Sequence, residues 1–90
     1  MEWNIEYLLD AHLIYVKTKG ILTANAANLM VKEIVKAADC HQCDRQIIDH
    51  RETSFALSLF EYYERPEVNS KIGISSKWKI AMVFKELNEN

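Results

Sequence analysis

Two cysteines lie three positions apart in the stretch Cys40-His41-Gln42-Cys43, a spacing used by both redox and zinc sites. A redox pair needs a thiolate at a helix N-terminus, where the positive end of the dipole stabilises the anion. This pair instead follows a predicted helix and precedes a predicted strand. A structural zinc site needs four ligands, and here the two cysteines could be joined at most by a distant histidine such as His50. We therefore interpret both cysteines as reduced thiols in a loop, with a metal site at Cys40, Cys43 and His50 as the weaker alternative.

His50 follows Asp49 at the end of a short apolar run, where α/β proteins often place functional groups. A catalytic histidine needs an orienting acid and a nucleophile within reach, and Glu52, Thr53 and Ser54 are close in sequence. Closeness in sequence does not establish that geometry. The chain contains no GxSxG elbow, glycine-rich phosphate loop or HExxH motif. We predict a protein that is not an enzyme and uses no cofactor.

The segment after this run carries the residues best suited to partner binding. Tyr62 and Tyr63 are adjacent, so on a helix they diverge by about 100° and one of them reaches the surface, as interface anchors do. A phosphate on Thr53 or Ser54 would be favoured at a helix N-terminus, although Glu52 would oppose it. The predicted phosphorylation or partner-binding residues are Asp49, Arg51, Thr53, Ser54, Ser58 and Tyr62.

The first part of the chain that must support these residues has the pattern of a β-hairpin. Apolar and polar residues alternate from Trp3 to Tyr7, which is typical of a half-buried strand. Asp10-Ala11 suits a tight turn, and His12 to Thr18 is a second β-rich run. We expect Gly20 to end this strand.

The middle of the chain predicts a helix followed by a buried strand. Thr23 is a suitable N-cap, and apolar residues recur at helical spacing from Ala27 to Ala38. That periodicity stops between Asp39 and Asp44. Gln46 to Asp49 then indicates a short central strand covered by helices.

A second helix is expected to begin at Thr53 or Ser54 and to end before Pro66, because proline is disfavoured in a helix interior. Its buried face should comprise Ala56, Leu59, Phe60 and Tyr63. A further short turn should end at Gly73, with the next residue packing back as in a helix C-cap. The last apolar segment, Lys79 to Phe84, predicts a strand.

These elements predict an α/β fold with the order β-β-α-β-α-β, a mixed sheet of about four strands, and helices packed mainly on one face. Crossovers of this kind favour parallel strand pairing. Ninety residues are enough for one domain, so we expect a single domain over residues 1–90.

Composition limits the classes of partner. The net charge of −2, without any basic run, argues against non-specific nucleic-acid binding. The apolar runs are too short to span a membrane, and the N-terminus lacks the pattern of a signal peptide. Together with two cysteines that are most simply reduced, these features favour the cytoplasm.

The element order, and the stretch Ile47-Ile48-Asp49-His50-Arg51-Glu52 leading into an aromatic helix, resemble the STAS-like group of SpoIIAA-like (anti-sigma-factor-antagonist-like) domains. Gly20-Ile21-Leu22-Thr23 is similar to their turn into the first helix, and Lys79 to Phe84 is similar to their next strand. The resemblance covers most of the chain by pattern. It implies a STAS-like fold and a regulatory module that binds a protein partner.

Two departures from this group affect the expected function. Its signalling members carry an Asp-Ser-Ser-Gly type motif whose serine a partner kinase phosphorylates, and this sequence has no such string; Thr53-Ser54 is the nearest hydroxyl pair. Members also continue with a further helix, strand and terminal helix, so the chain resembles only their first two-thirds. We expect either a fragment or a shortened variant that completes its sheet as a homodimer.

We therefore predict a non-enzymatic protein-interaction or regulatory module of STAS-like type. The alternative is a small-ligand or metal-binding domain that uses the Cys40–Cys43 loop and His50.

Overall fold

The computed structural model describes residues 1–85 of the chain. Its elements, in chain order, are β1 (Glu2–Leu8), β2 (Leu13–Leu22), α1 (Ala24–His41), β3 (Arg45–Phe55), α2 (Leu59–Ile72) and β4 (Lys79–Phe84). The strands form one sheet in the order β1-β2-β3-β4. β1 pairs antiparallel with β2, whereas β2–β3 and β3–β4 are parallel. The predicted α/β class, element order and mixed four-stranded sheet are confirmed.

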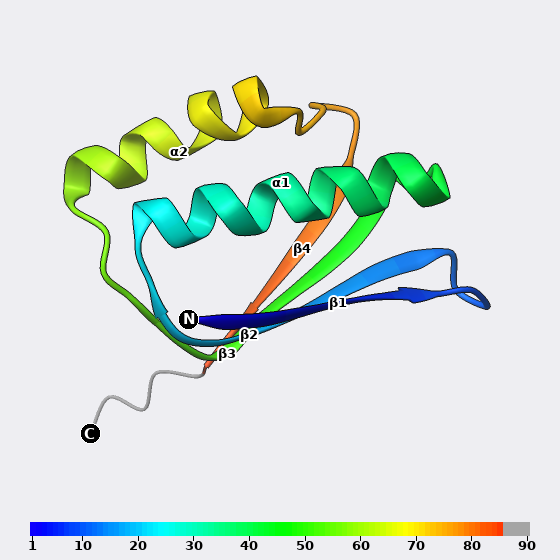
Figure 1. The fold of residues 1–90 in the computed structure, drawn as a ribbon, viewed down its shortest axis with the longest axis horizontal. Coiled ribbons are helices and arrows are strands. Elements are labelled where there is room, and N and C mark those ends of the chain that lie inside the picture. The colour runs from blue at the N-terminus through cyan, green and yellow to red at the C-terminus, as the bar shows by residue number, and fades with distance from the viewer. Residues whose placement is uncertain (86–90) are drawn as a thin grey trace.

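Both helices lie on the same side of the sheet (Figure 1). α1 begins after Thr23, whose hydroxyl accepts a hydrogen bond from the Ala26 N–H at 3.2 Å, as the N-cap prediction required. The buried face of α1 supplies five side chains, namely Ala27, Met30, Val31, Ile34 and Ala38. This helix therefore provides most of the apolar cover for the sheet.

The core lies between α1 and the two central strands. Ile14 and Val16 of β2 and Ile34 of α1 are fully buried, and Ile48 of β3 joins them. Burial of each such side chain stabilises the fold by about 1.5–3 kcal/mol relative to exposure. The opposite face of the sheet has no helix over it within residues 1–85 (Figure 1).

The predicted end of the second strand was wrong. β2 continues through Gly20 to Leu22, and Gly20 adopts a φ of 109° within the strand. A Cβ at this position would lie 3.2 Å from the Cα of Met1, so glycine also permits the close approach of the N-terminus. The residue expected to end the strand is instead accommodated inside it.

The predicted start and buried face of the second helix were also wrong. β3 extends past Asp49 to Phe55, and α2 begins only after the N-cap Ser58. α2 then passes through Pro66 and ends at Gly73, whose N–H donates to the Asn69 carbonyl. The expected buried residues Ala56, Leu59, Phe60 and Tyr63 are all exposed.

α2 is attached to the rest of the fold mainly through α1. It lies beside α1 and approaches none of the four strands closely. None of its residues is buried. Within residues 1–85, no helix is both long enough and apolar enough to cross a membrane.

Candidate functional site

The junction after Asp49 contains a β-bulge. Lys17 of β2 pairs with Asp49, but Lys19 pairs with Glu52, so β3 carries one residue more than β2 over this interval. Neither His50 nor Arg51, which lie between these two pairs, has a regular partner on β2. Bulges of this kind occur often beside functional sites, where they redirect side chains.

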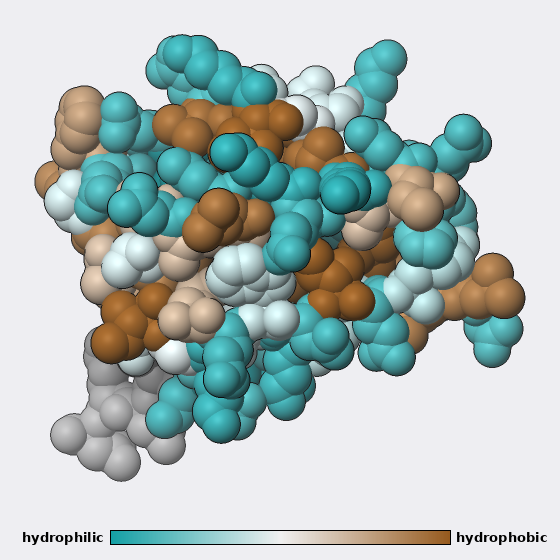
Figure 2. Space-filling view, in the orientation of Figure 1, coloured by the Kyte–Doolittle hydropathy of each residue, from teal (hydrophilic) through white to brown (hydrophobic). Residues whose placement is uncertain are grey.

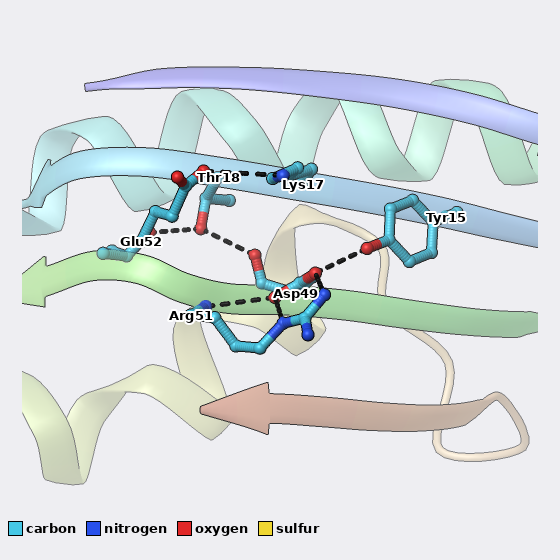
Figure 3. Close-up of polar contacts among 7 residues, drawn as sticks. Tyr15, Lys17, Thr18, Asp49, Arg51 and Glu52 are labelled. Carbon is cyan, nitrogen blue, oxygen red and sulfur yellow. Dashed lines mark hydrogen bonds and ion pairs between the residues drawn. The ribbon is translucent and has the colours of Figure 1, made fainter. Parts of the chain in front are cut away.

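Asp49 organises the polar contacts at this bulge. Its Oδ1 accepts from the Arg51 backbone N–H at 3.1 Å and from Arg51 Nε at 2.9 Å. Its Oδ2 accepts from Arg51 Nη2 at 2.7 Å and from the Tyr15 hydroxyl at 2.5 Å. Figure 3 shows Tyr15 and Arg51 both directed at this carboxylate. Asp49 is only 1% exposed, so these four contacts replace the water that it loses on folding.

The electrostatics of this cluster favour charged Asp49. The hydrogen bonds from Arg51, and then that from Tyr15, hold the pKa of the Asp49 carboxyl well below its usual range. The same contact with Asp49 raises the pKa of the Tyr15 hydroxyl and that of Arg51. A carboxylate held so firmly in its ionised form is a poor proton acceptor at neutral pH. The role of the cluster is therefore structural, because its hydrogen bonds stabilise the bulge.

A second polar group lies on the helix side of the same bulge. The Thr18 hydroxyl donates to the Asp49 carbonyl at 3.2 Å and lies 2.7 Å from His50 Nδ1. Its Oγ1 is also 2.5 Å from the hydroxyl of Thr53. Burial lowers the pKa of His50, so the neutral imidazole is favoured. Thr18, itself in contact with Thr53, thereby holds His50, and within residues 1–85 no carboxylate is hydrogen-bonded to its ring.

His50 also lines an apolar groove of about 490 Å³ between the two helices and the sheet. Its floor is formed by α1, the helix side of β3 and the helix side of β4, including Met30, Ile48 and Met82. α2 contributes the opposite wall through residues such as Arg65. This groove could not be predicted from the sequence, because its lining residues come from five separate segments of the chain.

Arg65 is the cationic side chain among the groove's described lining residues. Its Nη1 donates to Asn28 Oδ1 at 2.7 Å, and its Nη2 donates to Asn69 Oδ1 at 2.5 Å. Within residues 1–85 it forms no ion pair. Partial burial lowers the pKa of Arg65, although an arginine remains protonated at neutral pH. Among the described residues, Arg65 therefore provides one fixed positive charge in a groove whose lining is mostly apolar.

Large side chains at the start of α2 are exposed to solvent. Leu59, Phe60, Tyr62 and Tyr63, here called the α2 patch, are 72%, 71%, 49% and 78% exposed, respectively. Figure 2 shows hydrophobic residues at the surface over α2. Tyr62 also lines the groove, so the patch and the groove are adjacent.

The structure separates the residues of the metal-site alternative. Cys40 is exposed in the last turn of α1, and Cys43 is buried just before β3. His50 lies further along β3, and a strand advances about 3.3 Å per residue. Within residues 1–85, no group of three or more His, Cys, Asp or Glu side chains is arranged to hold a metal.

The other two histidines meet at Tyr7, at the end of the sheet near the β1–β2 turn. The Tyr7 hydroxyl is 2.6 Å from His12 Nδ1, and the His41 ring stacks on the Tyr7 ring at 4.0 Å. His50 does not join them, because it packs against Phe55. The three histidines therefore occupy two different sites.

The predicted hydroxyl residues are distributed over β3 and the start of α2. Thr53 is half-buried against Thr18, and Ser54 is exposed on β3, so neither lies at a helix N-terminus. Ser58 does occupy one: its Oγ accepts from the Glu61 N–H at 3.1 Å, and Glu61 Oε1 accepts from the Ser58 N–H at 2.8 Å. This reciprocal pair is a capping box.

Comparisons with protein-family models, curated proteins and solved structures found no match to this chain.

Proposed function

We propose that this protein is a non-enzymatic interaction module of STAS-like type that binds a protein partner through the α2 patch. The observation that carries the proposal is the exposure of Leu59, Phe60 and Tyr63 on a helix with no buried residue. Adjacent exposed apolar side chains mark interaction sites in soluble proteins. Aromatic residues are also frequent anchors of protein interfaces.

The patch suits a partner that offers an apolar groove to one helix. Leu59 and Tyr63 are four residues apart, so they lie one above the other on the same helix face. Helices that insert such residues into a groove are a recurrent recognition mode. The capping box at Ser58 fixes where this helix begins and so orients the patch.

Charges around the patch indicate the polarity of the partner's rim. α2 carries Glu61, Glu64 and Glu67 against Arg65 and Lys71. Lys71 pairs with Glu67 at 3.4 Å, and Arg65 is directed to neutral amide oxygens. The N-terminal half of α2 is therefore acidic. We expect the partner's groove to have basic residues at its rim.

The internal contacts of the junction support a role without catalysis. Asp49 is held ionised by Arg51, and His50 is fixed by Thr18. A general acid–base pair requires one of these groups to exchange a proton with a substrate. Both groups are instead engaged in holding the bulge.

The proposal also includes a cytoplasmic location, a homodimer and regulation at Ser58. Of the predicted hydroxyl residues, Ser58 is the one at a helix N-terminus, where a phosphate would be favoured. It is next to the patch, so a phosphate there would change the surface that the partner contacts. The adjacent Glu61 carboxylate would oppose that phosphate.

The test is affinity capture from native extract with the full chain as bait, using wild type and a Phe60→Glu/Tyr63→Glu variant. Each captured protein is then purified and titrated against both baits by calorimetry. A matched control, Leu9→Glu/Ile21→Glu, adds the same charge at exposed apolar positions away from α2. We expect binding about tenfold weaker, or worse, for the patch variant and unchanged binding for the control.

Circular dichroism of the three baits confirms that they fold alike. If every purified protein that binds wild type also binds the patch variant with the same affinity, the α2 patch is not the interface. Intact-mass measurement of the chain recovered from native cells tests Ser58 separately. An unmodified chain would remove phosphorylation from the proposal and leave constitutive binding.

A further inference from the structure

We propose that the groove between α1, α2 and the sheet binds a free alkyl carboxylate, with its chain on the apolar floor and its carboxylate at Arg65. This site is distinct from the outward-facing α2 patch and does not depend on the proposed protein partner. Tyr62 is the residue that the two surfaces share.

The floor of the groove is suited to an alkyl chain. Met30 of α1, Ile48 and Phe55 of β3, and Met82 of β4 line it with carbon and sulfur atoms. Its volume of about 490 Å³ lies in the range of sites that hold one small molecule, about 300–1,000 Å³. That volume fits a single chain better than the two chains of a membrane phospholipid.

α2 covers this space without filling it. The helix has no buried residue and approaches none of the strands closely, so the space between it and the sheet is not closed by its side chains. Water gains few hydrogen bonds against walls of this kind, whereas an alkyl chain gains van der Waals contacts. An apolar ligand would therefore fill the space between α2 and the sheet and supply the packing contacts that the helix itself does not make.

Arg65 supplies the charge that selects an anion. Its two hydrogen bonds go to the neutral amide oxygens of Asn28 and Asn69. Within residues 1–85 no carboxylate pairs directly with it, although Glu61 and Glu64 lie near enough to favour its charged form. A guanidinium has five N–H donors, so donors remain for a carboxylate in a bidentate arrangement. Arg65 is partly buried, and an ion pair formed there is less screened than one at the open surface.

Another wall of the groove is aromatic and uncharged. The rings of Phe55 and Phe84 are 5.2 Å and 5.8 Å from the His50 ring, and 5.8 Å from each other. Because the neutral form of His50 is favoured, this wall adds no second cation. Among the described residues that line the groove, an anionic head is therefore directed to Arg65.

The test is an NMR titration of the ¹⁵N-labelled full chain with decanoate, decanol and decyltrimethylammonium, each below its micelle concentration. Decanoate should bind saturably, with the largest shifts at Ile48, Phe55 and Met82. Decanol should bind about tenfold more weakly, because it lacks the charge, and the cationic amphiphile should not saturate.

Substitutions of Arg65 test whether this residue binds the carboxylate head group. Arg65→Gln should weaken decanoate binding about tenfold and leave decanol binding unchanged, and Arg65→Lys should have an intermediate effect because it keeps the charge but loses the bidentate geometry. Arg45→Gln removes an exposed arginine outside the groove and serves as the matched control. It should bind decanoate as wild type does.

Each of the following results would overturn the proposal. Decanoate that fails to saturate, or that binds no better than decanol, would show that the groove does not recognise an alkyl carboxylate. Binding to anionic phospholipid vesicles without saturable decanoate binding would assign the groove to a membrane lipid.

Discussion

At the scale of single residues, the buried charge of Asp49 depends on a partner two positions along the same strand. The bulge frees the Arg51 N–H from the ladder, and the Asp49 carboxylate accepts both this N–H and the Arg51 guanidinium. Tyr15 reaches the same carboxylate from β2. Asp49 therefore joins the two central strands where their register changes, which explains a charged residue in the middle of the sheet.

Asp49→Asn should lower the free energy of unfolding by about 2 kcal/mol, because a buried acceptor of charge-assisted hydrogen bonds is replaced by a neutral amide. Urea unfolding at pH 7 measures this loss. Lys17→Gln is the matched control, since it removes the exposed Lys17–Glu52 pair next to Asp49 in the ladder. That change should cost less than about 1 kcal/mol.

The same variant should change the dependence of stability on pH. The pKa of Asp49 is lower in the folded chain than its unfolded value of about 4, so its contribution is present above that value. It is lost as the pH falls towards the folded pKa, because the unfolded chain takes up the proton first. Wild type should therefore lose stability more steeply than Asp49→Asn below about pH 5. Parallel curves would show that Asp49 is not the group responsible.

At the scale of helices and strands, sequence patterns predicted the elements whose stabilising signals lie within the element itself. The N-cap Thr23 and the stripe from Ala27 to Ala38 specify α1 because both signals lie within the helix itself. The end of β3 could not be predicted from Arg51 to Ser54, because these residues alternate weakly. Glu52 to Phe55 are extended because they pair with Lys19 to Leu22 beyond the bulge. That pairing joins segments about thirty residues apart.

The candidate site likewise contains residues that were predicted from the sequence and residues that were not. Asp49, Ser58 and Tyr62 were predicted from sequence, and they lie at the bulge, the helix cap and the patch, respectively. Tyr15 and Arg65 were not predicted, since their roles depend on contacts between β2 and β3 and between α2 and α1. Phe60 and Tyr63 of α2 were expected to be buried and are exposed, because helical spacing identifies a face of the helix but not what covers that face.

Pro66→Ala should stabilise α2 locally. Proline cannot donate the N–H that would bond to the Tyr62 carbonyl, and it is about 3 kcal/mol less favourable than alanine in a helix interior. Because α2 packs mainly on α1, we expect it to open independently of the sheet. Amide exchange in α2 should therefore slow by about tenfold or more, with little change in β2 or β3.

Ser58→Ala provides the opposite change in the same helix. It removes the capping box, which should cost about 1 kcal/mol and speed exchange in α2. Hydrogen exchange followed by mass spectrometry resolves both variants by peptide. If neither substitution alters exchange in α2, the helix opens only with the whole domain.

At the scale of the whole molecule, the two edges of the sheet differ in character. β1, at one edge, exposes Glu2, Asn4 and Glu6, which disfavour pairing with another strand. β4, at the other, carries no charge between Lys79 and Lys85, and its residues Met82 to Phe84 are exposed. The β4 edge is therefore the better template for a second copy of the chain.

We accordingly expect a homodimer formed through β4, which light scattering over a range of concentrations would detect. Ala81→Lys places a charge on the exposed face of this strand, and in an antiparallel pair of β4 strands the two lysines would repel each other. This variant should be monomeric at concentrations where wild type is dimeric. Asn4→Lys introduces the same charge at the β1 edge and should leave the dimer intact. A wild-type chain that stays monomeric at all concentrations would contradict the homodimer, and an unaffected Ala81→Lys dimer would place its interface elsewhere.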